Sequence, residues 1–220
     1  MGIGKKGFTL VEIIVSLAIM TIVAGAVGAF VIAGNNSYMR GNKELTLQEE
    51  AQLTANQMID LIIDVEKGIS FSNLTDQEAV DVDGNVAKDV NGMEVTNASV
   101  SELRLINNDN SYMIRWQGGA GADYADANQV YLYEVTNSKD AEGKLVVGDF
   151  DAARPALMAE HVSSFSVDLS ELDKRKVVLN MTFTYQDKSY DISETIKLRN
   201  DLSSEPSSIY SWISGIRIIP

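Results

Sequence analysis

The chain of 220 residues contains no cysteine, one histidine (His161) and only three prolines. Without cysteine there can be no disulfide bonds, thiolate zinc sites or cysteine nucleophiles, and one histidine leaves little for imidazole chemistry. Basic residues are also scarce. The chain has 18 Lys and Arg against 31 Asp and Glu, a net charge of -13 that disfavours binding along nucleic-acid backbones. The fold must therefore be held together by packing, and we expect no nucleic-acid partner.

Sequence motifs for catalysis and cofactor binding are also absent. The chain contains no P-loop, GxSxG or GxGxxG string, and no nucleophile context accompanies His161 and its neighbour Glu160. Asp81, Asp83, Asn85 and Asp89 suggest a calcium loop, but Gly84 comes too early for the EF-hand pattern, so an acidic turn is favoured. We predict a protein that is not an enzyme, with no catalytic residue, cofactor or metal site.

The feature that dominates the sequence is a long apolar run near its start. From Phe8 to Gly34 the only charged residue is Glu12. A helix of this length, at about 1.5 Å per residue, can cross a hydrocarbon core of roughly 30 Å. Lys5 and Lys6 precede the run, and because basic residues stay on the cytoplasmic side, we expect the acidic remainder of the chain to be exported.

The residues that open this run form a specific string, Gly4-Lys5-Lys6-Gly7-Phe8-Thr9-Leu10-Val11-Glu12. It closely resembles the prepilin cleavage motif of type IV pilins and type II secretion pseudopilins. The resemblance implies that a membrane prepilin peptidase cuts after Gly7 and methylates the new amine of Phe8. It also implies that Glu12 is the carboxylate used in assembly.

The chemistry of Glu12 supports this interpretation independently. A carboxylate inside an apolar helix costs about 2.5–3.5 kcal/mol at the bilayer centre, so such residues usually have a partner or a task. No basic residue lies one turn away on the same helix. Cleavage after Gly7 would create a charged amine on Phe8 of every subunit, and a neighbour's amine could neutralise Glu12. Alternatively, Glu12 lies near the cytoplasmic interface and reaches toward water in a plain membrane anchor.

A second helical pattern follows the apolar run. From Asn35 to Lys67, apolar residues recur at intervals of 3, 4 and 7, and Gly68 is expected to end the helix. The stripe covers barely three turns, which favours packing on the chain's own sheet over a coiled coil. We therefore predict four segments: a leader peptide (1–7), a transmembrane and assembly helix (8–34), its amphipathic continuation (35–68) and a β-rich globular domain (69–220).

The remainder of the sequence reads as strands and turns. An irregular acidic connection is expected over 72–99, followed by strands at 100–106, 112–116, 130–135 and 145–150. The clearest alternation is the pair 177–186 and 190–198, joined by a turn at Asp187 and Lys188. The predicted fold class is α+β: a long N-terminal helix packed on one antiparallel sheet, which is also the pilin architecture.

The C-terminal half carries a second resemblance. The stretch from Leu157 to Leu169, followed by a hairpin that ends at Leu198-Arg199-Asn200, looks like the corresponding part of J-type minor pseudopilins and W-type minor pilins. Beyond it, the apolar tail from Asp201 to Pro220 is expected to pack back as a short helix and a strand, or to dock on a neighbouring subunit.

Taken together, the sequence predicts a structural subunit of a type IV pilus-like filament, most simply a minor pilin or minor pseudopilin. Its partners would be other pilin subunits, the prepilin peptidase, the membrane and, indirectly, the assembly platform and extension ATPase. It would reside in the cytoplasmic membrane with a single span, and later in an extracellular pilus or a periplasmic or cell-wall pseudopilus. The alternatives are a major pilin and a membrane-anchored binding domain that never polymerises. A DNA-uptake subunit would need a basic strip, and Lys174-Arg175-Lys176 more simply caps a strand turn.

Overall fold

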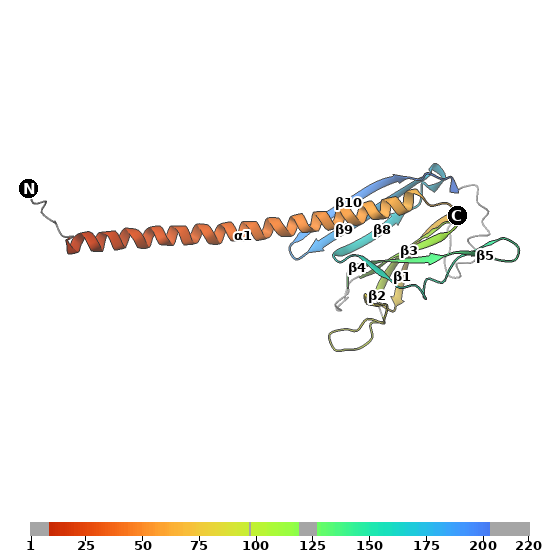
Figure 1. The fold of residues 1–220 in the computed structure, drawn as a ribbon, viewed down its shortest axis with the longest axis horizontal. Coiled ribbons are helices and arrows are strands. Elements are labelled where there is room, and N and C mark those ends of the chain that lie inside the picture. Colours follow the sequence, from red (N-terminus) through yellow and green to blue (C-terminus); the bar gives the residue numbers. More distant parts are fainter. Residues whose placement is uncertain (1–8, 97, 119–126, 203–220) are drawn as a thin grey trace, which may run out of the picture. The chain divides into compact units, whose positions relative to one another are not determined.

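The computed structural model describes residues 9–96, 98–118 and 127–202. It divides into two compact units, residues 1–45 and 46–220, which are described separately. One helix, α1 (Leu10–Ile63), supplies most of the first unit and continues into the second (Figure 1). The rest of the second unit is built from strands and a short 3-10 helix, so the predicted α+β class is confirmed.

The strands of the second unit form three antiparallel sheets. In chain order the elements are β1 (Gly68–Gln77), β2 (Ala98–Ile106), β3 (Asn110–Gly118), β4 (Gln129–Thr136), β5 (Ser138–Lys139), β6 (Leu145–Val146), β7 (Ala156–Ala159), β8 (Val162–Asp168), η1 (Leu172–Lys174), β9 (Lys176–Tyr185) and β10 (Lys188–Lys197). The five-stranded sheet has the order β1-β2-β3-β4-β7, and the three-stranded sheet has the order β10-β9-β8. Strands β5 and β6 pair with each other.

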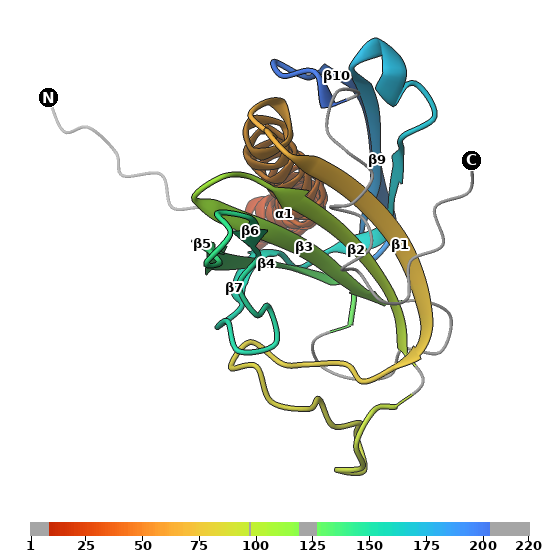
Figure 2. The ribbon, with the colours of Figure 1, turned by 90° about the vertical axis from the view of Figure 1, so that its right-hand side faces the viewer.

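The core of the domain forms where both large sheets meet α1. From Leu47 onward, one side of the helix is buried, and its apolar side chains join those of β2, β3, β8 and β9 in one cluster. Figure 2 shows α1 end-on, with β2, β3 and β4 on one side and β9 and β10 on another. Because the amphipathic stripe is buried within the chain itself, the coiled-coil alternative for this part of α1 is wrong.

Two contacts hold the two sheets together directly. The indole Nε1 of Trp116 on β3 donates a 2.6 Å hydrogen bond to the carbonyl of Val162 on β8. The rings of Phe71 on β1 and Phe165 on β8 meet edge to face, with centroids 5.7 Å apart. Both contacts join residues far apart in sequence, so they fix the topology rather than a local turn.

The C-terminal end of α1 is closed by the end of the last hairpin. The backbone N–H of Arg199 donates to the carbonyl of Ile63 at 3.0 Å, and the Asn200 amide donates to the carbonyl of Val65 at 2.8 Å. The Arg199 guanidinium also lies 2.6 Å from the Asp64 carboxylate. Helix ends leave carbonyls without partners, and these contacts satisfy two carbonyls at and just beyond the end of α1.

Several predicted boundaries need correction. The helix ends at Ile63 rather than continuing to Lys67, because the Lys67 N–H already donates to Ile106 on β2 and Gly68 begins β1. The predicted connection 72–99 begins within β1, which runs to Gln77, and in the predicted strand 145–150 only Leu145 and Val146 are in β6. The single predicted sheet is in fact two large ones, since alternation shows which face is buried but not which strands pair.

Other predicted elements are confirmed. The hairpin around Asn107–Asn110 joins β2 to β3, the turn at Asp187 joins β9 to β10, and Arg175 takes a left-handed conformation in the turn before β9. Of the apolar tail from Asp201 to Pro220, the part after Leu202 lies outside the described residues, as does the leader 1–7.

We predict that truncating the buried face of α1 destabilises the domain. Met58 is fully buried in the main cluster, so Met58→Ala should lower the free energy of unfolding by about 2–5 kcal/mol. Leu53 on the same helix is 64% exposed, and Leu53→Ala should cost less than about 0.5 kcal/mol. Urea denaturation of the full chain in detergent micelles measures both, and equal losses would contradict the assigned helix face.

Candidate functional site

The first turn of α1 contains a reciprocal set of hydrogen bonds between Thr9 and Glu12. The backbone N–H and the hydroxyl of Thr9 donate to Oε2 of Glu12 at 3.0 and 3.1 Å, and the N–H of Glu12 donates to the Thr9 hydroxyl oxygen at 3.3 Å. Thr9 precedes the first helical residue, Leu10, and Glu12 is the third. This arrangement is a capping box, in which two otherwise unpaired N–H groups at a helix start are satisfied.

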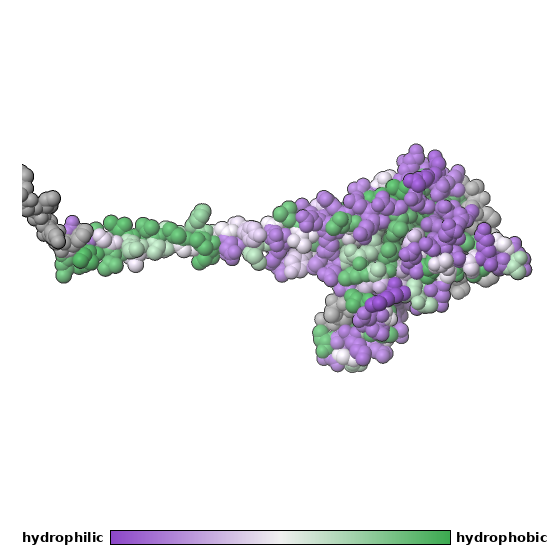
Figure 3. All heavy atoms as spheres, viewed as in Figure 1, coloured by the Kyte–Doolittle hydropathy of each residue, from purple (hydrophilic) through white to green (hydrophobic). Residues whose placement is uncertain are grey.

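The apolar residues that follow Glu12 are uncovered in the described part of the chain. Leu17 and Ile22 are among the many large side chains between Leu10 and Ile32 that are more than half exposed. Figure 3 shows this stretch of α1 as an almost continuous apolar surface. Its hydropathy and length are those of a membrane-spanning helix. A surface of this kind requires lipid or other apolar helices around it.

The structure describes only part of the motif predicted from the sequence. Glu12 lies in the first turn of α1, whereas Gly7 and Phe8 are outside the described residues, so the cleavage and methylation sites stay a prediction. Thr9 was missed as a candidate, although the spacing Thr9-x-x-Glu12 before an apolar run is the sequence signature of a capping box.

The residues considered for calcium form a hydrogen-bonded turn. Oδ1 of Asp81 accepts the backbone N–H groups of Asp83 and Asn85 at 2.9 and 2.8 Å. Slight burial acts to raise the pKa of Asp81, but the hydrogen bonds from Asn85, Asp83 and Gly84 outweigh it and hold the pKa below its ordinary value. Asp89 makes the same pair of bonds to Asn91 and Met93. These carboxylates therefore serve the turns, and among the described residues no group of three acidic or histidine ligands gathers.

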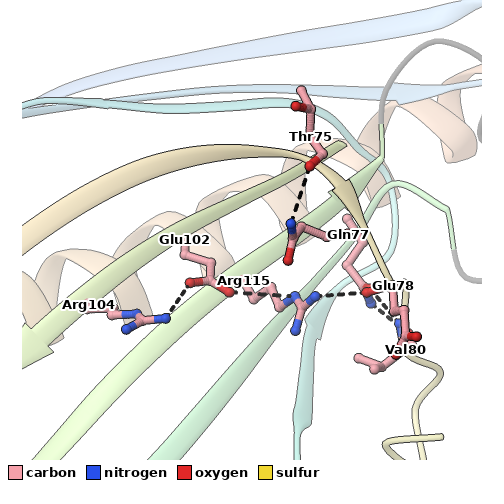
Figure 4. Close-up of polar contacts among 8 residues, drawn as sticks. Thr75, Gln77, Glu78, Val80, Glu102, Arg104 and Arg115 are labelled. Atoms are coloured by element: carbon pink, nitrogen blue, oxygen red, sulfur yellow. Dashed lines mark hydrogen bonds and ion pairs between the residues drawn. The ribbon is translucent and has the colours of Figure 1, made fainter. Parts of the chain in front are cut away.

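A charged cluster lies on the sheet face that does not meet α1. Glu102 on β2 is buried, and its carboxylate lies 2.8 Å from the Arg104 guanidinium and 3.9 Å from that of Arg115 on β3. Burial raises the pKa of Tyr133 beside this cluster, and the nearby Arg115 only partly offsets it. Arg115 also donates to the carbonyl of Glu78 at 2.9 Å (Figure 4). The charges neutralise one another and tie the segment after β1 to the sheet.

The same segment is held by a buried glutamine. The side-chain amide of Gln117 donates to the carbonyl of Val80 and its oxygen accepts the N–H of Val80, both at 2.6 Å. Gln117 has no exposed surface, so each of its polar atoms needs such a partner. The arrangement is structural, because neither group is left free to act on a substrate.

The single histidine lies where α1 meets the turn between β7 and β8. The Glu50 carboxylate accepts the backbone N–H groups of Glu160 and His161 at 2.7 and 3.1 Å, and its second oxygen lies 2.6 Å from Nδ1 of His161. The ring of His161 meets that of Tyr185 edge to face at 4.6 Å. A shallow polar depression of about 340 Å³ adjoins it, lined by Asn128, Gln129, Glu160, His161 and Thr184, with Ala127. His161 thus lies at the entry to β8, which begins at Val162.

Comparison with known protein families gives one match. Residues 4–28 match the family model described as the prokaryotic N-terminal methylation motif. No match is found to a curated protein or to a solved structure. The match covers the start of the chain, including the Thr9 and Glu12 capping box, and does not extend to the globular domain.

We predict that Glu50 stabilises the attachment of α1 to the β7–β8 turn. Glu50→Ala removes an acceptor from two backbone N–H groups and the His161 ring, which should cost about 1–3 kcal/mol. The neighbouring Glu49 is exposed, and Glu49→Ala should leave stability within about 0.5 kcal/mol. Urea unfolding at neutral pH compares the two variants, and an undiminished midpoint in Glu50→Ala would disprove the role.

Proposed function

We propose that the protein is a structural subunit of a type IV pilus-like filament. The premise is the prepilin-type motif at the N-terminus of the chain. The motif supports a pilin-like subunit that a prepilin peptidase processes and that assembles with other pilins. Pilins are structural rather than enzymatic proteins. The observation that carries the proposal is a carboxylate, Glu12, at the start of an apolar helix that nothing in the described chain covers.

Processing would divide the chain at the motif. In this proposal the peptidase removes the leader 1–7 by cutting after Gly7 and methylates the amine of Phe8. The helical segments 8–34 and 35–68 and the globular domain 69–220 then constitute the mature subunit. Removal of the leader takes away Lys5 and Lys6, the charges that hold the helix end on the cytoplasmic side.

Glu12 would then be the residue that sets the stagger between subunits. Its carboxylate pairs with the methylated Phe8 amine of a neighbour, so both charges are neutralised when the helices come together. The cost of a carboxylate in hydrocarbon, about 2.5–3.5 kcal/mol at the centre, gives this pairing its driving force. Apolar packing of the exposed residues from Leu10 to Ile32 supplies the rest of the bundle contact.

The cellular setting follows from the same steps. The hydrophobic helix anchors the subunit in the cytoplasmic membrane before assembly. The assembled form would be an extracellular pilus or a periplasmic or cell-wall pseudopilus, extended by an assembly platform and its ATPase.

A minor subunit is favoured over a major pilin by the C-terminal half. The stretch 157–169, which resembles J-type minor pseudopilins and W-type minor pilins, forms β7 and β8, and Arg199 and Asn200 of the matching end contact the end of α1. The runner-up is the major pilin of the same kind of filament. A membrane-anchored binding domain that never polymerises is the alternative from another class.

Mass spectrometry of sheared surface fibres and of membranes from the native cell tests the proposal directly. We expect an N-terminal peptide that begins at methylated Phe8, present in the fibres as a small fraction of the subunits. A dominant share would make the chain the major pilin. An intact Met1 terminus found only in membranes would reject the filament function in favour of the anchored domain.

The role of Glu12 predicts a selective defect. Glu12→Val should leave membrane insertion and cleavage intact and reduce the subunit in fibres at least tenfold, because the neighbour's amine loses its counter-charge. Glu44, exposed on the same helix, provides the control, and Glu44→Val should assemble normally. Immunoblots of sheared fibres and membranes measure both. Normal assembly of Glu12→Val would refute the pairing.

A further inference from the structure

The two large sheets end in β1, β7, β8 and β10, and an edge strand presents unpaired backbone N–H and carbonyl groups. Three of these edges are protected or covered. Strand β7 is only four residues long and meets the Thr54 side chain of α1, and β8 lies against β2 and β3 of the other sheet. Strand β10 carries Glu194 between Ile192 and Ile196 on its inward face, and an inward charge opposes pairing with a further strand.

The outer edge of β1 has no such protection. Its first seven residues, Gly68 to Leu74, pair in regular register with β2 and include no charged residue and no proline. Figure 2 shows β1 at the outer end of its sheet, and among the described residues no strand pairs with its other side. Phe71 and Leu74 pack against apolar clusters but are only half-buried. An uncharged edge of this length is suited to accept another strand.

The described chain ends close to the start of this edge. Leu202 is 3% exposed and belongs to the main apolar cluster. Two residues before it, the Asn200 side chain donates to the carbonyl of Val65, which lies three residues before the start of β1. The remaining 18 residues, 203–220, therefore depart from the end of the domain at which β1 begins.

The sequence of these residues has the composition of a short connection followed by a strand. The six residues 203–208 are Ser, Ser, Glu, Pro, Ser and Ser. From Ile209 to Ile219, isoleucine and aromatic residues dominate and Arg217 is the only charge. Such residues favour strands, and Tyr210, Trp212, Ile216 and Ile218, all at even positions, would share one face of a strand.

We propose that the segment from Ile209 to Ile219 adds to the outer edge of β1 of the same chain as a sixth strand. The segment runs parallel to β1, because it departs from the end at which β1 begins. Its even positions continue the inward face of β1 beside Phe71 and enlarge the main apolar cluster. The inference goes beyond the filament function and does not depend on it, since every residue involved lies in the globular domain.

Disulfide trapping tests this pairing, because the chain has no cysteine of its own. Ser72 of β1 points away from the inward face of Phe71, and facing positions of the added strand recur every second residue. Ser72→Cys is therefore combined in turn with Ser211→Cys, Ile213→Cys and Gly215→Cys. Neighbouring strands lie about 4.8 Å apart, which a disulfide can span. We expect at least one pair to form an intramolecular disulfide in most full-length chains in detergent micelles.

Thr195→Cys on β10 provides the matched control. Thr195 is exposed, lies on a strand edge and is only seven residues before Leu202, but its strand carries the inward Glu194. Combined with the same three tail cysteines, it should form at least tenfold less intramolecular disulfide than Ser72→Cys. Equal trapping at Thr195, or no trapping at Ser72, would overturn the proposal. Disulfides formed only between chains would also overturn it, because the tail of a second copy would then occupy the edge.

Amide hydrogen exchange measures the same pairing without cysteines. Trp212→Asp combined with Ile216→Asp places two charges on the inward face of the added strand. The β1 amides that point away from β2 should then exchange at least tenfold faster than in the wild type. Ser207→Asp combined with Ser208→Asp adds the same charge to the connection and should leave these rates unchanged. Unchanged rates in the Trp212 and Ile216 variant, with β9 amides still protected, would refute the added strand.

Discussion

Burial of one side of α1, from Leu47 to Ile62, is the interaction on which the globular domain depends. The five-stranded and the three-stranded sheet each present an apolar face, and both faces contribute to the cluster that contains this side of the helix. Without the helix, each sheet would expose that face to water. Other long-range contacts, such as the hydrogen bond from Trp116 on β3 to Val162 on β8, join the two sheets that pack against this side of the helix.

Polar side chains of α1 complement that burial at the edge of the five-stranded sheet. Strand β7 is the last strand of its sheet, and an edge strand presents unpaired backbone groups. The Thr54 hydroxyl lies 3.4 Å from the carbonyl of Met158, and Glu50 accepts the N–H groups of Glu160 and His161. Helix α1 thus supplies apolar contacts with its buried side. Its neighbouring polar residues, Glu50 and Thr54, bind backbone groups at the end of β7 and in the turn after it.

Periodicity and local motifs predicted the features that depend on neighbouring residues. The helix, the hairpin at 107–110 and the β9–β10 pair were found because their signals repeat every 3.6 or 2 residues. The helix end was misplaced, because it is set by Arg199, Asn200 and Asn107, which are remote in sequence. The Glu102 cluster could not be foreseen for the same reason, since its charges come from two strands, β2 and β3, and Arg115 also reaches the segment after β1. At the candidate site, Glu12 stood out as an isolated charge. The capping box that Thr9 forms with it was also visible in the sequence, as the spacing Thr9-x-x-Glu12, and was overlooked.

The segment between β1 and β2 has a property that matters for how the surface can diverge. Its hydrogen bonds to Gln117 and Arg115 of the sheet are made by main-chain atoms: Gln117 binds the N–H and carbonyl of Val80, and Arg115 donates to the carbonyl of Glu78. Its own base is closed by backbone bonds among Ala79, Ala87 and Val95. These main-chain hydrogen bonds do not involve the side chains at the exposed tips, such as Val82 and Val90. Mutations can therefore accumulate at those tips without loosening the fold, and an antibody raised against them would meet the most changeable part of the domain.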